Sequence, residues 1–298
     1  MHLPDDPTEL NALISLLDDP DETIYLQIRN RLLSIGSEVI PALESAWEHN
    51  AFGMLFQNRV EAIVHDIQFT SVFDQLKTWA SQGGPDLLDG LMLLSRYQYP
   101  DLDEEPIRKL LDQITRDIWL ELNDKLTALE KVRVINHILF EVYGFGGNTT
   151  NYHAPQNSYI NNVVESRKGN PISLSAIYTI LASRLELPIF GINLPKHFVL
   201  AYVDLMTMQP GISIGEAEIL FYINPFSRGG VFSRKEIDFF LKQLDLKPDP
   251  KFFSPCNNLT IVRRMLNNLT YSYHKLGYPD KVAEIEKLGN ALPPEDAA

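Results

Sequence analysis

The 298-residue sequence contains a single cysteine and has fewer basic than acidic side chains. Cys256 has no second cysteine to pair with, so an internal disulfide is excluded and the composition suits a reducing compartment. The 26 lysines and arginines are outnumbered by 39 aspartates and glutamates, which gives a formal net charge of -13. Nucleic acids and anionic membrane surfaces are bound through basic surfaces. We therefore expect no nucleic-acid partner and no membrane partner.

Long apolar runs are also missing. No stretch approaches the roughly 18 apolar residues that a membrane-spanning helix needs. The first residues, MHLPDDPTELNALISLLDD, are acidic and lack the basic region of a signal peptide. These absences predict a cytoplasmic protein.

Glycine-rich phosphate loops and metal-ligand clusters are absent as well. Gly146-Gly147 and Gly229-Gly230 are typical of turns, and no Gly-x-Gly-x-x-Gly or Walker pattern follows a strand. His137 and His153 show no metal-ligand spacing with His197. The sequence therefore predicts neither a cofactor nor a metal site.

Helical patterns dominate the first third of the chain. Residues 8–66 have apolar side chains at helical spacing, with breaks at residues 18–21 and 35–37. Weaker helical patterns follow over residues 58–68, 71–81 and 86–97. This punctuation resembles a HEAT-type repeat, although a plain helical bundle fits the pattern equally well.

The segment from Arg167 to Tyr202 predicts a buried helix followed by two strands. Asn170 can cap the helix, Pro171 suits its first position, and residues 172–185 are apolar or small on most faces. The strands are expected at residues 189–193 and 197–202. If Gly169 adopts a positive φ in the turn before the helix, alanine there should destabilise the fold.

Further elements are expected on both sides of this segment. Trp119 and Leu120 are expected to face inward, and Ser233 with Glu236 forms a capping box. A β-forming run covers residues 219–223. Helices are predicted at residues 107–122, 127–143, 159–165, 233–244, 259–276 and 281–292. The last two resemble a TPR-like hairpin.

Four short motifs in this region resemble the transglutaminase-like superfamily. They are Asn157-Ser158, Arg167-x-Gly169-x-Pro171-Ile172-Ser173-Leu174, Pro195-x-His197-Phe198 and Asn224-Pro225-Phe226. The resemblance covers about residues 125–292 and is closest to a divergent bacterial SirB-type branch. It implies a mostly helical α+β fold with a papain/transglutaminase-like core and a small antiparallel sheet. The predicted regions are 1–120 (HEAT-like or bundle), 121–246 (the core) and 247–298 (TPR-like).

The resemblance also implies where a catalytic site would lie. The superfamily uses Cys, His and Asp in that order, with the Cys at the start of the buried helix. In this sequence these positions are occupied by Pro171, His197 and Asn224. Loss of a nucleophile costs about a millionfold in turnover, and Asn for the orienting Asp about ten-thousandfold. We therefore expect a non-catalytic pseudoenzyme that acts as a protein-interaction or regulatory module, with a protein or peptide partner.

An alternative keeps catalysis with a rebuilt site. Ser158, in the preceding loop, or Ser173, about 200° around the helix from Pro171, could serve His197 as nucleophile in a hydrolase of peptide or amide bonds. His197 itself is either a remnant that contacts substrate or a ring bonded to a backbone carbonyl or to Asn224. Cys256 is expected to be a small, partly buried residue beyond the core.

Overall fold

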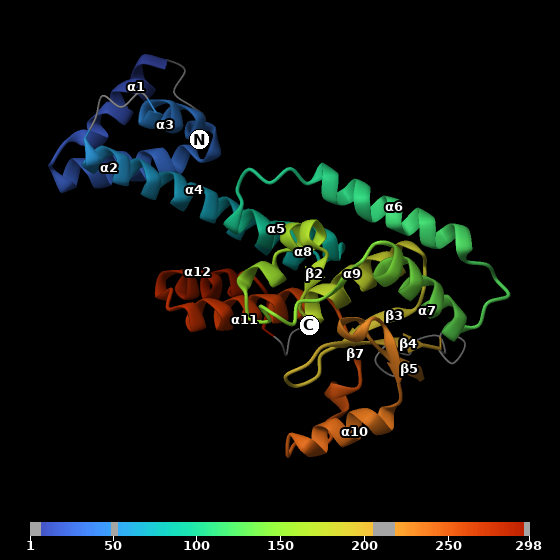
Figure 1. The fold of residues 1–298 in the computed structure, drawn as a ribbon. Helices are drawn as coiled ribbons and strands as arrows, with labels where there is room; N and C mark the ends of the chain where they lie inside the picture. The colour runs from blue at the N-terminus through green and yellow to red at the C-terminus, as the bar shows by residue number, and fades with distance from the viewer. Residues whose placement is uncertain (1–6, 49–52, 205–217, 295–298) are drawn as a thin grey trace. The chain divides into compact units, whose positions relative to one another are not determined.

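The computed structural model describes residues 7–48, 53–204 and 218–294, which separate into two compact units, Met1–Gln75 and Leu76–Ala298. The fold is α+β and mostly helical, with one small antiparallel sheet (Figure 1). The region boundaries expected at residues 120 and 246 stay predictions. Within the described ranges, no helix combines the length and apolarity needed to cross a membrane.

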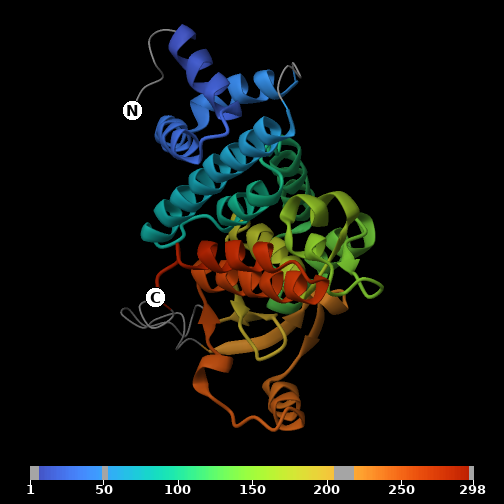
Figure 2. The ribbon, with the colours of Figure 1, turned by 90° about the vertical axis from the view of Figure 1, so that its left-hand side faces the viewer.

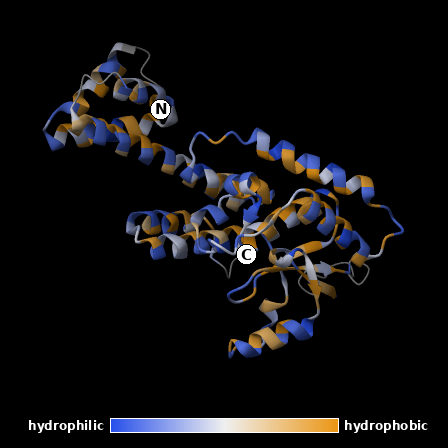
Figure 3. Ribbon diagram, in the orientation of Figure 1, coloured by the Kyte–Doolittle hydropathy of each residue, from blue (hydrophilic) through white to orange (hydrophobic). Residues whose placement is uncertain are grey.

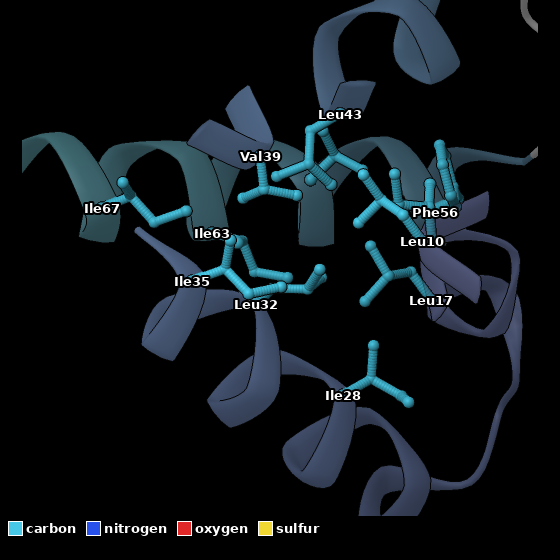
Figure 4. Packing of buried hydrophobic residues seen from close by; sticks show 12 residues of the cluster. Leu10, Leu17, Ile28, Leu32, Ile35, Val39, Leu43, Phe56, Ile63 and Ile67 are labelled. Carbon is cyan, nitrogen blue, oxygen red and sulfur yellow. The ribbon is translucent and has the colours of Figure 1, made fainter. Parts of the chain in front are cut away.

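The first unit contains helices α1 (Pro7–Ser15), α2 (Glu22–Ile35) and α3 (Ile40–Glu48), the short helices η1 (Leu16–Asp18) and η2 (Ser37–Val39), and the start of α4 (Met54–Ser81). The Asp21 carboxylate caps α2 by accepting the Thr23 N–H at 2.7 Å. Leu17, Leu32, Val39, Leu43 and Ile63 are fully buried and form the centre of the apolar core (Figure 4). The amphipathic spacing read from the sequence therefore corresponds to a packed core.

Helix α4 differs from the expectation of two separate helices at residues 58–68 and 71–81. It runs without a break from Met54 to Ser81. No proline or glycine interrupts residues 54–81, so nothing in the local sequence stops the helix. The sequence pattern of α4 is weak because the buried face of the helix changes along its length, and not because the helix ends.

The helices of the second unit confirm the predicted pattern. They are α5 (Leu87–Gln98), α6 (Glu105–Glu121), α7 (Ala128–Asn136) with the π-helical η3 (His137–Val142), α8 (Ile160–Ser166), α9 (Pro171–Arg184), α10 (Arg234–Gln243), α11 (Asn258–Leu276) and α12 (Pro279–Gly289). The short helices η4 (Pro155–Ser158), η7 (Pro225–Ser227) and η8 (Pro250–Phe252) lie in segments without a predicted helix. Helices α11 and α12 run side by side (Figure 2).

The inward orientation expected for Trp119 and Leu120 is wrong. Both side chains are exposed, at 65% and 68%. The buried stripe of α6 consists of Ile107, Leu111, Ile114 and Ile118 at helical spacing. Polar and apolar residues accordingly alternate along this helix in Figure 3. Trp119 and Leu120 lie outside the stripe because they follow Ile118 by 100° and 200° around the helix, respectively.

The five-stranded sheet has the order β6-β5-β4-β3-β7 with antiparallel pairs throughout. The strands are β3 (Ile189–Ile192), β4 (Val199–Val203), β5 (Ile219–Asn224), β6 (Gly230–Phe232) and β7 (Pro255–Cys256). Strand β4 starts at Val199, so His197 lies before the strand and not within it as predicted. A separate parallel pair joins β1 (Gly146–Gly147) to β2 (Lys168–Gly169).

Helix α9 lies at the centre of the second unit. It packs against β3 and β4 of the sheet and against α5, α6 and α11. Its side chains from Pro171 to Tyr178 are all buried. The predicted buried helix is therefore confirmed, and its N-terminus is the reference point for the candidate site.

Candidate functional site

The N-terminus of α9 is held by a buried network around Asn170. The Asn170 Oδ1 accepts the Ser173 N–H at 2.9 Å, as predicted for a cap, and the Asn170 Nδ2 donates to the Ser158 Oγ at 2.9 Å. The Asn170 N–H in turn donates to the Ser173 Oγ at 2.9 Å. All three side chains are buried. Both serines considered as nucleophiles are thus partners of the helix cap.

Pro171 occupies the first turn of α9, and its carbonyl accepts the Ser175 hydroxyl at 2.7 Å. The proline is buried and offers no nucleophilic or acidic atom. Its missing N–H costs nothing at this position because the first helical amides have no partner within the helix. The residue therefore fits the local structure while leaving the helix start without a thiol or hydroxyl of its own.

The turn before α9 differs from the expectation for Gly169. The positive φ falls on Arg167, at 60°, and not on Gly169. Gly169 is instead required by space, because a Cβ there would lie 2.5 Å from the Ser173 Oγ and 3.0 Å from a Val163 methyl group. The glycine lets the chain pass directly over the capping network.

The Asn224 turn lies beside the strand pair that leads into α9. A Cβ on Gly147 would lie 2.6 Å from the Phe226 ring, and Gly147 pairs with Gly169 across β1 and β2. The Asn224 Oδ1 accepts the Ser227 N–H at 3.3 Å, and its carbonyl accepts the Gly229 N–H at 2.9 Å. The amide oxygen of Asn224 therefore stabilises its own turn.

His197 lies in the turn between β3 and β4, where its backbone N–H donates to the Leu194 carbonyl at 3.2 Å. The ring is half-buried, with its centroid 6.1 Å from that of Phe240. Burial lowers the pKa of the imidazole, and the positive charge of Arg264 lowers it further. Across the described residues, no hydrogen bond joins this ring to Asn224, Ser158 or Ser173. The ring is therefore expected to be neutral at pH 7.

Sequence reasoning missed Arg264, on α11. Its Nη1 donates to the Asn193 Oδ1 at 3.0 Å and approaches the Leu194 carbonyl at 3.4 Å, so it braces the turn that carries His197. Burial lowers the pKa of the guanidinium. The only sequence signal is an arginine directly before the buried pair Met265 and Leu266, which places a cation near the apolar face of the helix.

Cys256 is part of the sheet, whereas the sequence placed it beyond the core. It pairs with Gly191 as the second residue of β7, and its side chain is partly buried. Burial raises the pKa of the thiol to about 12. A thiol of this kind is protonated at neutral pH and is a poor nucleophile. Within the described ranges, no three His, Cys, Asp or Glu residues gather as a metal site would require.

A family model described as the transglutaminase-like superfamily matches residues 105–267. A UPF0162 protein of Xylella fastidiosa is 30% identical over 203 residues, which cover 66% of this chain and 68% of the relative. A UPF0162 protein of Vibrio cholerae is 26% identical over 184 residues, 61% of this chain and 64% of the relative. No solved structure matches.

A human relative is much longer. F-box only protein 21 of Homo sapiens is 28% identical over 246 residues, which cover 75% of this chain but only 37% of the relative. The family model covers more than half of the chain, and its range contains α9, the sheet and most of α11. The chain therefore belongs to the transglutaminase-like superfamily, in a divergent branch with bacterial UPF0162 relatives.

Proposed function

We propose that this protein is a non-catalytic member of its superfamily that acts as a protein-interaction or regulatory module. The observation that supports the proposal is the start of α9, where the buried Pro171 stands at the position that the resemblance assigns to the superfamily cysteine. Acyl transfer by this kind of site needs a nucleophile that an adjacent imidazole activates. Proline supplies none.

The neighbouring hydroxyls support the same proposal. The Ser158 Oγ accepts a hydrogen bond from the Asn170 Nδ2. The Ser173 Oγ accepts a hydrogen bond from the Asn170 N–H and donates one to the Asn170 carbonyl at 3.2 Å. A serine that serves as nucleophile must also give its proton to a base, and among the described residues neither hydroxyl bonds the His197 ring. These contacts favour a structural role for both serines over the alternative hydrolase that would pair one of them with His197.

The relatives fit an interaction role for the module. Related sequence makes up a minor part of F-box only protein 21, so a core of this type also occurs inside a larger protein. We also propose that the chain belongs to the SirB-type branch, that its last two helices form a TPR-like hairpin and that the protein is cytoplasmic.

Two activity assays test the proposal. The first follows incorporation of a fluorescent primary amine into a glutamine-containing protein, and the second follows hydrolysis of an amide reporter. We expect wild-type rates equal to those of His197→Ala and of buffer alone, with an active transglutaminase as the positive assay control. A wild-type activity that His197→Ala or Ser158→Ala abolishes in a folded protein would establish the rebuilt hydrolase instead.

A further inference from the structure

A groove lies between α3 and α4 of the first unit, with a volume of about 510 Å³. Glu44, Trp47 and Glu48 line one wall from successive turns of α3, at the spacing that places side chains on one helix face. Val60, Glu61 and Val64 line the other wall from α4. The floor is apolar, because Val60 is buried and Val64 packs against the core.

Trp47 is 40% exposed at this groove. Partly exposed large aromatic side chains next to apolar surface are common anchors of binding surfaces. The face of an indole also attracts lysine and arginine side chains through cation–π interactions. Trp47 could therefore serve both an apolar and a cationic group of a ligand.

No described cation forms an ion pair with the carboxylates of the groove. Among the described residues, Glu44, Glu48 and Glu61 make no ion pair. Two arginines of the unit are already used elsewhere. Arg29 pairs with Asp66 at 2.6 Å, and Arg59 bonds the Leu17 and Asp19 carbonyls and Glu22. The three glutamates are thus left to face a partner.

The whole unit adds to this field. Residues 1–75 contain thirteen aspartates and glutamates, three arginines and no lysine, a formal charge of -10 out of the -13 of the chain. Such a field attracts a basic partner and repels an acidic one. A second copy of this chain would bring the same negative charge, so it is a poor occupant.

We propose that the groove between α3 and α4 binds a basic segment of a partner protein. A lysine or arginine of the segment lies over Trp47, and its neighbouring basic residues meet Glu44, Glu48 and Glu61. This inference rests on the proposed interaction role. It has its own readout, since peptide binding is measured independently of the catalytic assays on the core.

Binding is tested on the full chain with two labelled probes and fluorescence anisotropy. One probe is a short peptide of alternating leucine and lysine, and the other carries glutamate in place of each lysine. We expect saturable binding of the lysine peptide, weakened by added salt, and none of the glutamate peptide. Absence of saturable binding by the lysine peptide would overturn the proposal.

Matched variants separate the groove from general acidity. Glu44→Gln/Glu48→Gln/Glu61→Gln should weaken binding by at least about tenfold. The control Glu9→Gln/Asp18→Asn/Glu38→Gln removes the same charge from exposed positions that do not line the groove, and should change binding by less than about threefold. Equal weakening by both triple variants would show non-specific attraction and refute the site.

The tryptophan is tested in the same way. Trp47→Ala should weaken binding of the lysine peptide, whereas Trp119→Ala should leave it unchanged, because Trp119 is exposed on α6 of the second unit and does not line the groove. Far-UV circular dichroism checks that each variant is folded. Retained affinity in folded Trp47→Ala would contradict the placement of the basic side chain.

Discussion

Replacing Asn170 by alanine removes two buried interactions at once. The Ser173 N–H loses its cap, which costs about 1 kcal/mol. The Ser158 hydroxyl, 2% exposed, loses its donor, which adds about 1–3 kcal/mol because water cannot replace it freely. We therefore expect Asn170→Ala to lower the free energy of unfolding by about 2–4 kcal/mol.

The chain offers a matched control in the same unit. Asn257 caps α11 in the same way, accepting the Thr260 N–H at 2.9 Å, but its side chain is exposed. Asn257→Ala should cost only about 1 kcal/mol, because solvent can bond the freed amide. Urea unfolding followed by circular dichroism gives both values. The slope of the unfolding free energy against urea concentration is compared between the variants to check that the unfolding transition is the same. Equal losses for the two variants would refute the network.

A third variant separates the cap from the amide donor. Aspartate caps helices as well as asparagine does, so Asn170→Asp keeps the acceptor for the Ser173 N–H. It cannot donate to Ser158, and it places a carboxylate in a buried position. We expect Asn170→Asp to be destabilised by at least as much as Asn170→Ala at pH 7, with part of the loss recovered in acid as the carboxylate is protonated.

Gly169, Tyr97 and His197 each allow a further test of one contact or one buried group in the second unit. Gly169→Ala should destabilise by about 1–3 kcal/mol, because its Cβ meets the Ser173 Oγ; an unchanged melting temperature would exclude this close packing. Tyr97→Phe should cost about 1–2 kcal/mol in urea unfolding, because it removes the 2.6 Å bond from the phenol to Glu284. The folded pKa of His197 lies below its unfolded value, so the unfolded chain binds the proton first and stability falls as the pH drops through about 6.5. His197→Gln should therefore lose less stability than wild type on acidification, and an identical pH profile would contradict the lowered pKa.

Local rules predicted much of the fold correctly. The Asn170 cap and the contact of Glu236 with the Ser233 N–H at 2.7 Å were both expected from residues three apart in the sequence. The apolar run that follows Pro171 likewise identified α9 as the buried helix. These features depend on neighbours within one helical turn, where sequence patterns are informative.

Features that depend on distant partners were missed. Strand β7 is two residues long and forms only because Cys256 meets Gly191, so its local sequence has no strand pattern. The role of Arg264 depends on the turn at Asn193, 71 residues away along the chain. The candidate nucleophiles illustrate the same limit, because the bond between Ser158 and Asn170 connects two separate segments. The resemblance named these positions, but their hydrogen bonds could be read only from the fold.

The sheet position of Cys256 makes its thiol nearly unreactive toward thiol-labelling reagents. With a thiol pKa of about 12, the thiolate fraction at pH 7 is only about one in 10⁵, against a few per cent for an ordinary exposed cysteine. Maleimide or iodoacetamide reagents should therefore leave the wild-type chain almost unlabelled. A cysteine introduced at an exposed position such as Trp119 could then carry a fluorophore or spin label selectively, without first removing the native residue.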